Sequence, residues 1–192
     1  MVRQWLGNLA DMMARQKLGN SISIGRNSKI HCRLISMRQN CTVKVGTNSL
    51  IEGGIAFDKE EASVLIGNRT FVGGGARLVC AEQITLGDDV LIAWGCTIVD
   101  HNSHALSWTK RQNDVLLWLE GKKDWTYVKR SAVKIENKAW IGFDAIILKG
   151  VTIGEGSIVA AGSVVISNVP SFTIVAGNPA KVVRELTDDE RE

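Results

Sequence analysis

One short motif recurs along most of the chain, and it limits the fold more than any other feature of the sequence. Its copies begin at six aliphatic residues: Ile24, Val45, Ile66, Leu86, Ile135 and Ile153. A small or β-branched residue lies four positions after each start, and another aliphatic residue lies six positions after it. A period of six matches neither an amphipathic helix nor a simple strand. It predicts three short strands per turn of a triangular prism.

The period also predicts the position of each side chain. Two further rows of aliphatic and aromatic residues should point inward: Ile30, Ile51, Val72, Ile92, Ile141 and Val159, then Phe57, Leu78, Ile98, Ile147 and Val165. The small corner positions are Ser28, Ser49, Thr70, Val90, Ala139 and Ser157. We expect a positive φ at the turns, where glycine and asparagine gather: Gly25, Gly46, Gly67, Gly87 and Gly154, with Asn27, Asn48 and Asn137. A β-sandwich with glycine-rich turns is the alternative.

Composition narrows the class of protein. The 192 residues suit one ordinary domain, and a net charge of +3 is too small to indicate nucleic acid as the main partner. No apolar run approaches the roughly 20 residues of a membrane helix, and the first residues lack a signal-peptide core. The four cysteines form no CxxC pair, so we expect reduced thiols in a cytoplasmic protein.

Two segments depart from the repeat. Residues 2–18 carry an apolar stripe typical of a helix, made of Trp5, Leu6, Leu9, Met12 and Met13. We expect this helix to cap the open end of the prism, although peripheral contact with a membrane surface is the other interpretation. Residues 102–131 form a long excursion that holds three of the six tryptophans. The predicted organisation is a cap at 1–20, the repeat domain at 21–186 and a tail at 187–192.

Histidine marks the candidate catalytic position. His101 and His104 lie where the regular coil gives way to the excursion, whereas His31 is several coils away. Imidazole is well suited to remove a hydroxyl proton near neutral pH. Asp100 either orients one imidazole or stabilises the turn, and the sequence leaves both roles open.

From about Ile24 to Leu186 the hexads and the C-terminal segment resemble the hexapeptide-repeat acyltransferases. The resemblance implies an all-β fold, a left-handed parallel β-helix with an N-terminal capping helix, a protruding loop and a short C-terminal helix that follows the AGNPAK turn. The DHNSH stretch and the tryptophan-rich excursion look like the acetyltransferases of cell-surface polysaccharide synthesis, of the colanic-acid and O-antigen type. The implied activity is transfer of acetyl from acetyl-CoA to a sugar hydroxyl, without a metal.

The resemblance also implies particular residues. The acyl-CoA would lie between subunits of a homotrimer, with Trp140 and Gly142 beside its pantetheine arm and Ala161 giving backbone contacts. Lys181 and Arg184 would lie near the CoA phosphates. In relatives the general base follows the last inward aliphatic residue by five or six positions. That spacing favours His104 over His101, which would then help to bind the acceptor.

Departures and alternatives remain. Ser167 stands where relatives often carry a lysine, so one phosphate contact is missing, and FVGGGARL replaces a stretch that contacts the acceptor in galactoside and maltose acetyltransferases. Other functions on the same fold are N-acetylation of an amino sugar or another amine, a zinc carbonic anhydrase and a non-catalytic scaffold. We expect the excursion to govern acceptor choice.

Overall fold

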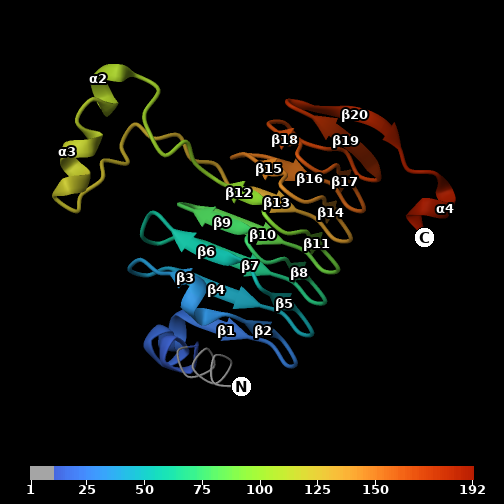
Figure 1. The fold of residues 1–192 in the computed structure, drawn as a ribbon, viewed down its shortest axis with the longest axis horizontal. Helices are drawn as coiled ribbons and strands as arrows, with labels where there is room; N and C mark the ends of the chain where they lie inside the picture. Colours follow the sequence, from blue (N-terminus) through green and yellow to red (C-terminus); the bar gives the residue numbers. More distant parts are fainter. Residues whose placement is uncertain (1–10) are drawn as a thin grey trace.

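The computed structural model describes residues 11–192, which form a parallel β-solenoid with three faces (Figure 1). Sheet A contains β1 (Ile22–Ile24), β4 (Thr42–Val45), β7 (Ser63–Ile66), β10 (Gln83–Leu86), β13 (Val133–Ile135) and β16 (Thr152–Ile153). Sheet B contains β2 (Lys29–Ile30), β5 (Leu50–Ile51), β8 (Phe71–Val72), β11 (Leu91–Ile92), β14 (Trp140–Ile141), β17 (Ile158–Val159), β19 (Thr173–Gly177) and β20 (Ala180–Glu185). Sheet C contains β3 (Ile35–Ser36), β6 (Gly54–Phe57), β9 (Arg77–Cys80), β12 (Thr97–Val99), β15 (Ile146–Ile147) and β18 (Val164–Val165).

The predicted interior is confirmed. Side chains of the three predicted rows are buried, and only Ile24, in the first coil, is half-buried. Equivalent residues stack in register, as Ile92 does with Val72 on one side and Ile141 on the other. The corner hydroxyls bond to the next coil: Ser49 Oγ donates to the Gly67 carbonyl at 2.9 Å, and Thr70 Oγ1 donates to that of Gly87 at 2.8 Å. Ser49 and Thr70 are polar because their hydroxyls bond the next coil, whereas Val90 and Ala139 are small and apolar at the same corner.

One coil differs from the predicted phase. Phe57 was expected in the row of Leu78, but Ile55 pairs with Leu78 and Phe57 pairs with Cys80. The turn before β6 is shortened at Gly53, where a Cβ would lie 2.7 Å from the Ala76 carbonyl oxygen. Both Ile55 and Phe57 are buried, because these strands are long enough to present two inward positions.

The turn glycines occur where the sequence predicts turns, but the expected positive φ is not the reason for them. Gly67, for example, does not have a positive φ; a Cβ there would lie 2.5 Å from the Gly87 carbonyl. The left-handed conformation occurs two positions later, at Asn27 and Asn48 as expected, and in a later coil at Lys138 rather than Asn137. Close stacking of successive coils, not backbone freedom, requires the glycines.

The N-terminal prediction is tested only in part. A helix covers residues 11–18 of the described chain and is followed by η1 (Gly19–Ser21), and η2 (Cys32–Leu34) lies in the first coil. Ala14 and Leu18 pack on the core, whereas Met12 and Met13 are exposed, contrary to the predicted stripe. The other predicted stripe residues lie outside the described residues: Trp5, Leu6 and Leu9. No helix within residues 11–192 is long and apolar enough to cross a membrane.

The C-terminal segment folds back on the solenoid. β19 pairs with β17 in parallel and with β20 in antiparallel, and a short helix, α4 (Asp188–Arg191), ends the chain. The predicted short C-terminal helix is confirmed, but it begins later than the end of the AGNPAK turn, because β20, which carries Lys181 and Arg184, comes between them. Through this hairpin the backbone of β19 is paired on both sides, with β17 and with β20.

The excursion lies between β12 and β13 and projects from one side of the solenoid (Figure 1, yellow-green). It contains two short helices, α2 (Trp108–Arg111) and α3 (Asp114–Leu119). Despite this insertion, β13 pairs with β10 in the register that β10 keeps with β7.

Candidate functional site

Asp100 fixes the point where the excursion leaves the coil. It is fully buried, and its carboxylate accepts hydrogen bonds from the Ala81 and Glu82 amides, both at 2.8 Å, and from Cys80 Sγ at 3.3 Å. Burial, together with the neighbouring carboxylate, raises the pKa of the Cys80 thiol. Of the two roles that the sequence left open, these contacts correspond to turn stabilisation.

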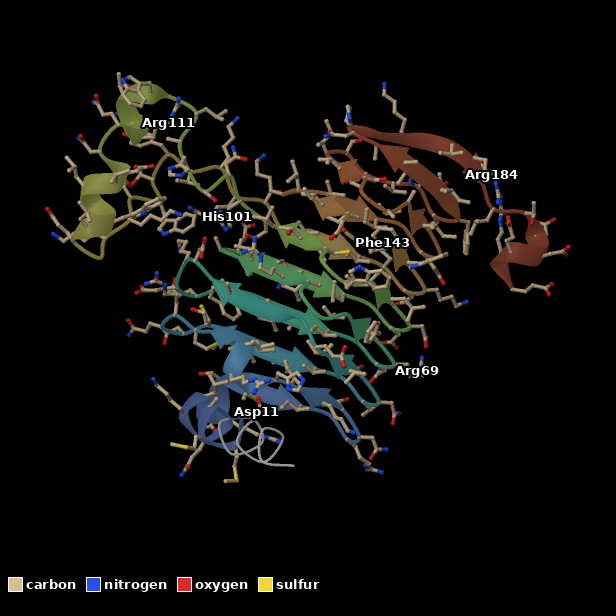
Figure 2. The ribbon with its side chains drawn as sticks, in the orientation of Figure 1. Asp11, Arg69, His101, Arg111, Phe143 and Arg184 are labelled. Atoms are coloured by element: carbon tan, nitrogen blue, oxygen red, sulfur yellow. The ribbon has the colours of Figure 1, made fainter. Side chains whose placement is uncertain are left out.

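His101 is enclosed at the base of the excursion (Figure 2). Its side chain is 0% exposed, its backbone bridges that of Arg130, and its ring meets Trp125 edge-on at 5.3 Å. The Ser103 amide donates to Nδ1 at 3.0 Å. Burial lowers the pKa of His101, so the neutral ring is favoured. With Nδ1 accepting, the proton of this neutral ring lies on Nε2, and no ring lone pair remains free to act as a base.

His104 has the opposite environment. Its side chain is 41% exposed, and its Nδ1 lies 2.5 Å from Asp114 Oδ2. The carboxylate accepts, so Nδ1–H donates and the lone pair of the neutral imidazole lies on Nε2. The ring also packs on Trp118 at 5.0 Å. A partly exposed imidazole oriented by a carboxylate is the arrangement that general-base catalysis requires.

Sequence reasoning missed Asp114. This residue is buried at the first position of α3, ten positions after the histidine that it contacts. The only signal was an acidic residue after an asparagine, which is typical of a helix start. Because the two side chains come from different turns of the excursion, only the fold brings them together.

A pocket of about 620 Å³ adjoins His104. Its walls include Asn102, Leu106, Trp108, Arg111 and Asp114. Arg111 donates to the carbonyls of Ala105 and Leu106, and its guanidinium lies 5.6 Å from the Trp108 ring, so it ties the first half of the excursion together.

All but one of the residues predicted to hold CoA are exposed on the outside of the solenoid. Trp140 is 51% exposed on β14, and Ala161 and Lys181 are exposed. Gly142 is buried, and a Cβ there would lie 2.6 Å from the Ala161 amide nitrogen, so coil packing alone accounts for this glycine. Arg184 is paired with Glu190 through two contacts of 2.6 and 2.7 Å, which raise the pKa of the guanidinium.

Within one chain the two halves of the predicted site are apart. The histidines follow the C-terminal end of β12, whereas Gly142 and Ala161 precede the N-terminal ends of its neighbours β15 and β18. Figure 2 shows this separation between the labelled His101 and Phe143. A strand of three residues rises about 3.3 Å per residue, so the two ends of the strands are roughly 10 Å apart. Over residues 11–192, no group of three or more His, Cys, Asp or Glu side chains is arranged to hold a metal ion.

Comparison with known proteins agrees with this architecture. Residues 132–167 match the family model "Bacterial transferase hexapeptide (six repeats)". A hexapeptide-repeat-containing acetyltransferase from Vibrio cholerae is 30% identical over 78% of this chain and 76% of its own, with a TM-score of 0.63. Its acetyl-CoA complex aligns over 95% of this chain and 86% of that chain, with 26% identity and a TM-score of 0.59.

Two curated relatives match over shorter stretches. An Escherichia coli (strain K12) protein, provisionally assigned as a lipopolysaccharide biosynthesis O-acetyltransferase, is 33% identical over 57% of this chain and 54% of its own length. A 2,3,4,5-tetrahydropyridine-2,6-dicarboxylate N-acetyltransferase of Enterococcus faecalis is 54% identical over 29% of this chain and 24% of its own. The chain thus spans about half or less of these curated relatives. From the repeat architecture and the extended match to the Vibrio cholerae protein, the chain belongs to the hexapeptide-repeat acetyltransferase family.

Proposed function

We propose that the protein is an O-acetyltransferase that uses acetyl-CoA and acts on a sugar hydroxyl in cell-surface polysaccharide biosynthesis. The observation that carries this proposal is the His104–Asp114 pair, which presents an oriented imidazole to an open pocket. The acetyl-CoA complex of the Vibrio cholerae relative supports the donor, and the Escherichia coli relative supports the acceptor class.

In the proposed mechanism, acetyl-CoA supplies an acetyl group activated as a thioester. His104 Nε2 takes the proton of the sugar hydroxyl while the hydroxyl oxygen bonds to the acetyl carbonyl carbon. As the carbon–sulfur bond breaks, His104 returns the proton to the departing sulfur. Asp114 keeps Nδ1 protonated throughout and stabilises the imidazolium that forms between the two transfers.

Substitution of each histidine tests which of the two is the general base. His104→Ala should lower turnover by about 10²–10⁴-fold and leave acetyl-CoA affinity nearly unchanged. His101→Ala should cost less, and mostly in acceptor KM, because that ring supports the base of the excursion. Near wild-type turnover in His104→Ala together with complete loss in His101→Ala would reverse the assignment.

The assembly that we propose is a homotrimer in which a neighbouring chain completes each site. The separation of the histidines from Gly142 and Ala161 motivates this, because one chain does not bring the two halves together. The outer face of sheet B also carries an apolar row across adjacent strands, which includes Leu91 at 50% and Trp140 at 51% exposure. CoA phosphates would meet Lys181 directly but would have to compete with Glu190 for Arg184. If sedimentation showed a stable, active monomer, the proposed trimer would be wrong.

Transfer to nitrogen is the second candidate, and the Enterococcus faecalis relative favours it. The deciding experiment measures release of CoA thiol with matched hydroxyl and amino sugars. Preference for the hydroxyl series supports the first proposal, and preference for the amines supports the second. Absence of thiol release with every acceptor, while acetyl-CoA is bound, would favour a non-catalytic scaffold.

A further inference from the structure

A second pocket, of about 650 Å³, lies between the excursion and the corner of the solenoid that follows β6. Trp118, Lys123 and Trp125 come from the excursion, and Arg38 and Asp58 come from two coils of the solenoid. Trp118 also packs on His104, so this pocket adjoins the proposed catalytic base. A ligand held here would extend toward that histidine.

Lys123 is an unusual cation in this pocket. Its ammonium lies 4.1 Å from the centre of the Trp125 ring and 5.6 Å from that of Trp118. Partial burial lowers its pKa, the carboxylates of Asp58 and Asp114 oppose this shift, and the positive charge of Arg38 adds to it. The adjacent Lys122 pairs with Glu120 at 2.9 Å, whereas Lys123 has no ion pair among the described residues. Two aromatic rings therefore position an ammonium whose strongest hydrogen bonds are still to be made.

An unsatisfied polar atom lies behind the pocket wall. His101 Nε2 is buried without a hydrogen-bond partner, although Asp58 Oδ2 is 3.5 Å away. The Asp58 carboxylate is partly exposed and lines the pocket. It is therefore an acceptor that a ligand hydroxyl can use, and a small shift toward His101 would also satisfy Nε2.

The pocket carries other charges as well. Lys59, Glu60 and Lys122 line it, so both signs are present, but Lys122 is already paired. Neither Arg38 nor Lys123 has an ion pair among the described residues, and the positive charge of Arg38 acts against that of Lys123. An anion between them would relieve that repulsion.

We propose that this pocket binds an acidic sugar unit of the acceptor. The C–H face of the sugar would pack on a tryptophan ring, its hydroxyls would donate to Asp58, and its carboxylate or phosphate would bind Lys123 and Arg38. That the bound sugar is the acceptor rests on the proposed function; that the pocket selects an oxyanion on a sugar rests on its own residues.

The test is a direct binding measurement by calorimetry on the whole protein without acetyl-CoA. The probes are a disaccharide with a uronic acid, its neutral counterpart and a sugar phosphate of the same ring. Wild type should bind at least one acidic probe about tenfold or more tightly than the neutral one, and added salt should reduce the difference. Comparison of the carboxylate with the phosphate identifies the preferred group.

Lys123→Met keeps the apolar stem on the tryptophans and should abolish the acidic preference. Arg38→Gln, at an exposed position, should reduce it without disturbing the excursion. The matched control is Lys110→Met, because Lys110 lies 4.2 Å from the Tyr127 ring on the same excursion but outside this pocket. Equal binding of neutral and acidic probes, or an unchanged preference in both pocket variants, would overturn the proposal. Acidic-sugar binding without acetyl transfer would instead retain the pocket and reject the proposed function.

Discussion

Substitution of Asp114 by asparagine tests the assignment of the site most directly, because it removes a charge and changes few atoms. In the wild type, Asp114 Oδ2 accepts from His104 Nδ1 at 2.5 Å, and the aspartate side chain is only 12% exposed. A hydrogen bond to a charged group contributes about 1.5–3 kcal/mol. If that amount is lost only when the imidazolium forms, turnover falls about 10- to 150-fold, since about 1.36 kcal/mol corresponds to a factor of ten.

The assay is steady-state release of CoA thiol, with acetyl-CoA affinity measured separately. Asp124→Asn is the matched control, because Asp124 is on the same excursion and its Oδ1 accepts from the Thr126 amide, which asparagine can also satisfy. We expect wild-type turnover in this control and unchanged acetyl-CoA affinity in both variants. Wild-type turnover in Asp114→Asn, with His104→Ala inactive, would refute the orienting role of the carboxylate.

Three further predictions concern stability, each measured by urea unfolding. Burial depresses the pKa of His101 below the usual value of about 6.5, so as pH falls the unfolded chain binds the proton first. The free energy of unfolding should therefore decline as pH falls below about 6.5. Between pH 7 and 5, that of His101→Gln should decline less than that of the wild type, and equal declines would contradict this explanation. Ile98→Ala should cost about 2–5 kcal/mol, whereas the outward Thr97→Ala should cost less than about 1 kcal/mol. Gly67→Ala should destabilise by about 1–3 kcal/mol because its Cβ meets the next coil, whereas Gly74→Ala, with open space around it, should be neutral or stabilising by up to about 1 kcal/mol.

The regular part of the fold follows from local rules that are visible in the sequence. Each hexad places an aliphatic residue at a fixed interval, and equivalent residues of successive coils stack on one another. Residues such as Ile92 and Ile141 could therefore be assigned to the core without a structure. The prediction failed where a coil changes length, as at Phe57, because a shortened turn shifts the phase without altering the residue types.

The candidate site was predictable only in part. His101 and His104 were found because the repeat stops beside them, but their roles depend on burial and on partners that are distant in sequence. Asp114 and Asp58 carry no periodic signal: Asp114 meets His104 through folding within the excursion, and Asp58 approaches His101 from the corner that follows β6. The C-terminal helix begins after β20 rather than at the AGNPAK turn, because pairing with β19 overrides local preference.

The excursion begins and ends at nearly the same point. The Ser131 amide donates to the Asp100 carbonyl at 2.9 Å, and His101 bridges Arg130 immediately beyond. At the equivalent corner one coil earlier, only Ala81 and Glu82 separate β9 from β10. Going from two to roughly thirty residues is about four doublings of loop length, at about 0.6 kcal/mol of closure entropy each, or close to 2.5 kcal/mol.

That cost depends on the length of the excursion and not on its sequence. A replacement segment of different length, joined at Asp100 and Ser131, would meet the same backbone hydrogen bond and leave the pairing of β10 with β13 unchanged. The excursion can therefore be exchanged as a block during evolution. The segment beside His104 can diverge in this way while the coils that carry it keep their pairing.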